Sequence, residues 1–156
     1  MSDFDLGQLF PDFSLEKPDG GTVTKEDLAG RKAVIFFYPR DNTPGCTTEA
    51  IDFTTLKPEF EQAGVALLGV SKDSPQKHRN FIAKHELTVD LATDAQDDGL
   101  SDRLGIWTEK KNYGRTYMGM VRTTYLLDEH GTILRVWPGV RVKGHAAEVL
   151  EAARTV

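Results

Sequence analysis

Two apolar runs separated by the length of one helix constrain the fold of this chain more than any other feature. Residues 33–38 have the β-branched and aromatic content of a buried strand, and residues 65–70 form a second run of this kind. Between them, the residues from 46 to about 55 have a helix-compatible composition, and Pro58 predicts a kink or break beyond it. A strand, helix, strand order with short joins implies a right-handed parallel crossover. The sequence therefore predicts a βαβ unit at the centre of an α/β domain.

The later part of the chain carries signals for another helix, a hairpin and a C-terminal helix. Ser74 and Pro75 provide a cap followed by a first-turn proline, which predicts a helix to about residue 85. Residues 123–127 and 132–137 are joined by the turn-rich sequence Asp-Glu-His-Gly and predict a β-hairpin. A last helix is expected from about His145.

Composition and charge exclude several classes of protein. No composition break, repeat or low-complexity tract divides the 156 residues, so we expect one domain over residues 1–156. The net charge is −5 and no stretch concentrates Lys and Arg, so nucleic acid is not an expected partner. The longest purely apolar run has six residues, far short of the ~20 that a membrane-spanning helix needs. Because acids stand at the N terminus where a signal peptide carries bases, we expect a cytoplasmic protein with no membrane partner.

Cys46 is the only cysteine of the chain. A single cysteine excludes an internal disulfide, and the cytosol keeps thiols reduced, so this residue serves either inert packing or chemistry. The histidines are spread over different predicted elements without ligand spacing, so we expect no metal site and interpret them as solvated or capping residues. They are His78, His85, His130 and His145.

The residues around Cys46 resemble a known enzyme family. The pattern Pro39-x-x-x-Thr43-x-x-Cys46 is similar to the active-site motif of peroxiredoxins, and the string over residues 37–50 resembles the peroxiredoxin Q group, also called bacterioferritin comigratory protein. The similarity continues through residues 69–71, 111–115, 122–128 and 144–150, and so covers nearly the whole chain. It implies a thioredoxin-like fold with a central mixed sheet flanked by helices. It also implies a thiol-dependent peroxidase that reduces hydrogen peroxide and organic hydroperoxides through a sulfenic acid at the cysteine.

The implied activity depends on a thiolate at Cys46. A peroxidatic cysteine must be ionised at neutral pH, whereas an ordinary thiol titrates near pH ~8.5. A helix N terminus offers unpaired N–H donors and partial positive charge, and Cys46 is predicted to lie where a loop enters a helix. The resemblance adds the guanidinium of Arg122, a Thr43 hydroxyl that accepts from the peroxide and donates to the thiolate, and Pro39 as a shield from water. Glu49 either favours the helix dipole or orients Arg122, and both interpretations remain open.

The chain departs from the family at the resolving cysteine. Many peroxiredoxin Q proteins carry it five positions after the peroxidatic one, where this chain has Ile51, and others carry it near residues 81–84, where again there is none. The resemblance therefore implies an external thiol reductant, which could be glutathione, a glutaredoxin or a thioredoxin, and no other cofactor. It also implies a monomer, which is common in this group. The apolar side chain of Ile51 is expected to anchor its helix against the core.

Two other functions on the same fold are weighed. A thiol-disulfide oxidoreductase needs a C-x-x-C pair, but Thr43 stands three positions before Cys46. A peroxide sensor would pass its oxidation to a bound partner protein, and catalytic turnover with an ordinary reductant would count against that role.

Overall fold

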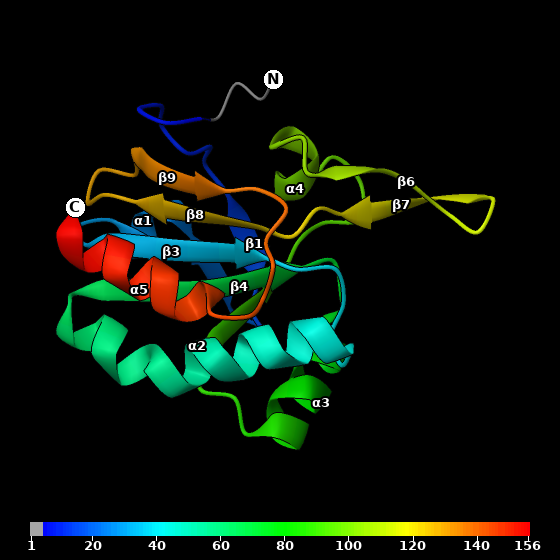
Figure 1. Cartoon of the computed structure of the whole chain (residues 1–156), viewed down its shortest axis with the longest axis horizontal. Coiled ribbons are helices and arrows are strands. Elements are labelled where there is room, and N and C mark those ends of the chain that lie inside the picture. Colours follow the sequence, from blue (N-terminus) through cyan, green and yellow to red (C-terminus); the bar gives the residue numbers. More distant parts are fainter. Residues whose placement is uncertain (1–4) are drawn as a thin grey trace.

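The computed structural model describes residues 5–156 as a mixed sheet flanked by helices, with a separate two-stranded ribbon that projects from it (Figure 1). The acidic N terminus on which the cytoplasmic expectation rests falls mostly in residues 1–4, which lie outside the described residues. The strands are β1 Ser14–Glu16, β2 Thr22–Thr24, β3 Lys32–Phe37, β4 Val65–Ser71, β5 Asp90–Thr93, β6 Trp107–Asn112, β7 Arg115–Met120, β8 Thr123–Leu127 and β9 Ile133–Trp137. The helices are α1 Lys25–Leu28, α2 Pro44–Gln62, α3 Pro75–His85, α4 Leu100–Arg103 and α5 His145–Thr155.

The sheet has seven strands in the order β2-β1-β5-β4-β3-β8-β9. Strands β3, β4 and β5 are parallel, and β8 runs antiparallel to β3 and to β9. The βαβ unit, the hairpin and the mixed thioredoxin-like sheet predicted from the sequence are therefore confirmed. Helix α3 begins after Ser74, whose side chain accepts a hydrogen bond from the Lys77 N–H, as the cap signal predicts.

Strand β3 is buried on both faces, which explains why it reads as a continuous apolar run. Val34 and Phe36 point into a core shared with α2, α3 and α5, whereas Ile35 and Phe37 point into a second core on the opposite face. Helices α1 and α4 contribute to that second core, so the sheet is covered on both sides (Figure 1). The strand ends of β3 and β4 are thus held rigidly between two apolar layers.

The sequence predicts a kink or break at Pro58, but helix α2 runs without interruption from Pro44 to Gln62, so there is no break. A proline inside a helix costs about 3 kcal/mol. Phe53 and Phe60 flank it and are both fully buried, and burying each such side chain stabilises the protein by roughly 1.5–3 kcal/mol. Packing on both sides of Pro58 therefore outweighs its cost.

Ile51 is 39% exposed, so the expectation that it anchors α2 is also wrong. The buried face of this helix instead contains Cys46, Glu49, Ala50 and Phe53, which follow the helical spacing of three and four residues. No helix within residues 5–156 is both long enough and apolar enough to cross a membrane.

Candidate active site

Cys46 is the third residue of α2 and is 1% exposed. The helix begins at Pro44, where the missing N–H costs nothing because first-turn amides have no acceptor within the helix. The first main-chain hydrogen bond of the helix runs from the Thr47 N–H to the carbonyl of Thr43, four residues earlier. The amides of Gly45 and Cys46 precede that bond and concentrate the positive end of the helix dipole around the sulfur.

Arg122 lies against this first turn. Its Nη2 atom is 3.3 Å from Cys46 Sγ, and its Nη1 atom donates to Glu49 Oε1 at 2.7 Å. The antiparallel register of β3 and β8 pairs Phe37 with Thr123, which brings Arg122 to the end of β3 despite its distance along the chain. The structure thus brings together three of the residues expected at the site.

Gly45 permits the close approach of the guanidinium. A Cβ atom at this position would lie 3.2 Å from Arg122 Nη2, closer than nine in ten real Cβ contacts. A larger residue beside the cysteine would therefore require the guanidinium to shift by a few tenths of an ångström.

Glu49 is a buried carboxyl with one partner. Only 1% of it is exposed, and its Oε2 atom has no hydrogen-bond partner among the described residues. Burial raises the pKa of Glu49 to about 7, although the neighbouring Arg122 acts in the opposite direction. Burial alone would lower the pKa of Arg122, but the charges of Glu49 and Cys46 outweigh this effect. The pKa of Arg122 is therefore raised and its guanidinium stays protonated.

Thr43 and Pro39 lie in the segment between β3 and α2, residues 38–43, which we name the entry loop. Both side chains are half-buried. The Thr43 hydroxyl donates to the Arg40 carbonyl at 2.9 Å, so the expected donation to the Cys46 sulfur is not found here. The hydroxyl oxygen keeps its lone pairs and can still accept a hydrogen bond.

The interpretation of the histidines as solvated or capping residues is wrong for His78 and His145, which are both buried. His145 Nε2 lies 2.8 Å from Thr124 Oγ1, and burial lowers the pKa of His145 to about 4, with the charge of Arg122 acting in the same direction. The imidazole is therefore neutral at pH 7. His145 lies four residues before Val149, on the same face of α5, and this helical spacing of buried positions was the signal that could have predicted its burial.

Among residues 5–156, no group of three or more His, Cys, Asp or Glu side chains is arranged to hold a metal ion. The chemistry that the described residues offer is that of one sulfur atom beside a fixed cation. Cys46 lies at the N terminus of a helix that packs on a thioredoxin-like sheet, and an arginine contacts its sulfur. This arrangement defines a thiol-based redox enzyme.

The chain belongs to the AhpC/TSA family, whose model matches residues 6–136. It is 41% identical over 150 residues to peroxiredoxin Bcp of Bacillus subtilis, covering 96% of this chain and 95% of that protein. It is 43% identical over 143 residues to peroxiredoxin Bcp of Xanthomonas campestris, covering 92% and 89%. Among solved structures, peroxiredoxin Q of Xanthomonas campestris superimposes with a TM-score of 0.87 at 40% identity, covering 96% of each chain. The chain is therefore a peroxiredoxin of the Q or Bcp group, in a form with one cysteine.

Proposed function

We propose that the chain reduces hydrogen peroxide and organic hydroperoxides at Cys46. The observation that carries this proposal is the distance of 3.3 Å between Arg122 Nη2 and the sulfur at the N terminus of α2. The thiolate attacks one peroxide oxygen, the O–O bond breaks, and the other oxygen leaves as an anion that takes a proton to become water or an alcohol. The sulfur is oxidised to a sulfenic acid and the peroxide is reduced.

The first turn of α2 and Arg122 provide the donors for this reaction. The guanidinium stabilises the thiolate before the attack and the negative oxygen as it leaves, and the free amides of the first turn add to both effects. Glu49 holds Arg122 through its Oε1 atom and acts as a positioning residue. In the proposal, the Thr43 oxygen accepts a hydrogen bond from the peroxide and Pro39 limits the access of water.

The catalytic cycle is completed by an external thiol, because the chain has no second cysteine. A first thiol attacks the sulfenic acid, which forms a mixed disulfide and releases water, and a second thiol releases Cys46. The reductant is glutathione, a glutaredoxin or a thioredoxin. We also propose that the enzyme is a cytoplasmic monomer and needs no cofactor beyond this thiol.

Support for the substrate class comes from a related protein. Structures of the bacterioferritin comigratory protein of Xanthomonas campestris, 39% identical to this chain, are described as giving insight into its alkyl peroxide reduction activity. One of these structures superimposes on this chain with a TM-score of 0.87, covering 99% of this chain and 98% of the bacterioferritin comigratory protein.

The test is peroxide consumption by the wild-type protein and by Cys46→Ser, with hydrogen peroxide and an organic hydroperoxide. The glutathione, glutaredoxin and thioredoxin systems are supplied separately. We expect turnover with at least one reductant and none in Cys46→Ser, since serine is nearly isosteric but a poor nucleophile at neutral pH. Substantial turnover in Cys46→Ser, or none in the wild-type protein with any system, would overturn the proposal.

A further inference from the structure

We propose that Asp41 and His78 form a buried positioning pair that holds the entry loop, and with it the first turn of α2, in place for the attack on peroxide. This inference rests on the proposed function. The two residues come from different elements, since Asp41 lies in the entry loop and His78 in α3. Among the described residues, neither Asp41 nor His78 forms a hydrogen bond or an ion pair with Cys46 or Arg122.

Asp41 is buried and is held at three points. Its N–H donates to Asp73 Oδ2 at 2.8 Å, and its Oδ1 atom accepts from the Tyr38 hydroxyl at 2.6 Å. Its Oδ2 atom lies 2.7 Å from His78 Nδ1 in an ion-pair contact, and has no hydrogen-bond partner among the described residues. A loop residue with both main-chain and side-chain groups anchored in the interior cannot shift without breaking several buried contacts.

The imidazole of His78 is oriented by contacts at both of its ring nitrogens. His78 is fully buried, and its Nε2 atom lies 3.1 Å from the Ala92 carbonyl, which can only accept, so Nε2 carries a hydrogen. Its Nδ1 atom faces two oxygens, Asp41 Oδ2 at 2.7 Å and the Tyr38 hydroxyl at 3.4 Å. Burial raises the pKa of Tyr38 well above its ordinary value, so its hydroxyl stays protonated and donates.

The contacts of Asp41 connect the entry loop to Asp73, at the end of β4, and to His78 in α3. Asp73 follows β4 and is itself held by the Ser71 hydroxyl, which donates to its Oδ2 atom at 2.7 Å. Asn42, the residue after Asp41, has a φ of 62°, a left-handed backbone that needs support from its surroundings. Two residues after Asp41, the N-cap residue Thr43 begins the helix that carries the sulfur.

The consequence is a fixed distance between two halves of the site. Arg122 is held by the sheet through β8, whereas Cys46 is held by α2 through the entry loop. Releasing the loop lets the first turn drift relative to the guanidinium, and a misplacement of about 1 Å can cost on the order of 10²-fold in rate. The Asp41 and His78 pair therefore acts on the reaction through position alone.

The test compares Asp41→Ala with Asp41→Asn. Alanine removes both side-chain contacts, whereas asparagine keeps an oxygen for the Tyr38 hydroxyl and places an NH₂ group opposite Nδ1 of His78. The measurement is the second-order rate constant for oxidation of the reduced protein by hydrogen peroxide, with the urea midpoint recorded for each variant. We expect Asp41→Ala to be slower by about tenfold or more, and Asp41→Asn to stay within about threefold of the wild type.

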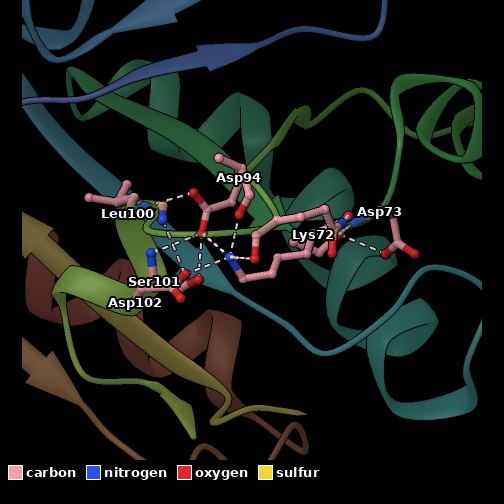
Figure 2. A network of polar contacts seen from close by, with 10 residues as sticks. Lys72, Asp73, Asp94, Leu100, Ser101 and Asp102 are labelled. Atoms are coloured by element: carbon pink, nitrogen blue, oxygen red, sulfur yellow. Dashed lines mark hydrogen bonds and ion pairs between the residues drawn. The ribbon is translucent and has the colours of Figure 1, made fainter. Parts of the chain in front are cut away.

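The matched control is Asp102→Ala, because within the described residues Asp102 forms no hydrogen bond or ion pair with Asp73, although Figure 2 draws both residues in one polar network. Figure 2 shows the buried side chain of Lys72 reaching Asp94 and Asp102, with an ion pair of 2.6 Å to Asp102. Asp102 belongs to α4, on the opposite face of the sheet from α2. Asp102→Ala should therefore lower the urea midpoint and leave the rate of oxidation by peroxide unchanged.

His78→Leu covers the case in which Asp41→Ala does not fold. It removes the imidazole that contacts Asp41 and fills the buried space with an apolar side chain. It should show the same slow oxidation. Wild-type rates in every folded variant that breaks the pair, or an Asp41→Asn variant as slow as Asp41→Ala, would overturn the inference. A wild-type protein that does not react with peroxide at all would instead refute the proposed function.

Discussion

Replacing Glu49 by Gln tests the electrostatics of the site through the pH dependence of stability. Glu49 is buried, and its pKa is raised from 4.5 to about 7. Below about pH 4.5 the carboxyl is protonated in the folded and the unfolded chain alike. As pH rises from there to 7, the unfolded chain releases this proton while the folded protein retains it, so the unfolded state gains stability.

The size of this effect follows from the pKa. At about 1.4 kcal/mol per pKa unit, the rise to about 7 corresponds to roughly 3 kcal/mol of folding stability that is present below pH 4.5 and lost above pH 7. A glutamine side chain cannot ionise, so the Glu49→Gln variant does not lose this stability. The free energy of unfolding of Glu49→Gln minus that of the wild type should therefore increase by up to roughly 3 kcal/mol between pH 4.5 and 8.

The assay is urea denaturation of both proteins at about six pH values across this range. His145, whose pKa is lowered to about 4 by burial, raises stability with pH in both proteins and cancels in the difference. The amide oxygen of the introduced glutamine can still accept from Arg122, so a constant offset between the two proteins is allowed. A difference that does not change with pH would refute the assignment of Glu49 as a buried carboxyl that resists ionisation.

Three further predictions concern the sulfur, its arginine and the helix that carries them. Arg122→Ala should slow oxidation of Cys46 by about 10²- to 10³-fold in stopped-flow measurements, and Arg122→Lys should slow it less; equal rates in all three proteins would remove Arg122 from the site. Excess peroxide without thiol should oxidise Cys46 to the sulfinic acid, visible as two added oxygens in the intact mass, and a sulfenic acid that persists would reveal an unrecognised protection. Phe53→Ala should lower the free energy of unfolding by about 3–5 kcal/mol in urea denaturation, because Phe53 is fully buried and stacks on Phe36; a loss below ~1 kcal/mol would contradict its place in the core.

The elements that the sequence predicts well are those in which local signals and tertiary packing agree. Strand β3 is apolar throughout because both of its faces are covered, and α3 begins where Ser74 and Pro75 predict. Helix α2 extends beyond Pro58 because the packing of Phe53 and Phe60 overrides a local signal, and a single sequence does not show that packing.

The ribbon of β6 and β7 was not predicted, and the reason is its exposure. Its strands have few apolar positions, so the alternation that reveals a half-buried strand is weak. The turn is visible only in retrospect, because Tyr113 and Gly114 both take positive φ values, as a type I′ turn requires.

The site was predicted in part. Local sequence places Cys46 at a helix start, whereas Arg122 came from the family resemblance, since no spacing rule connects it to the cysteine. The burial of His78 and its contact with Asp41 depend on how α3 packs against the entry loop. Contacts of that kind follow from the folded arrangement and have no signature in a single sequence.

The register between β3 and β8 also bears on when a folding chain gains its full reactivity. Cys46 follows β3, but its guanidinium partner precedes β8, and the two strands pair only after a long loop has closed. A nascent or partly folded chain that has formed only the β3-α2-β4 unit therefore carries the sulfur without its cation. Full reactivity toward peroxide requires this pairing, so the rate at which refolding molecules regain the wild-type rate of oxidation should follow the formation of the β3–β8 strand pair.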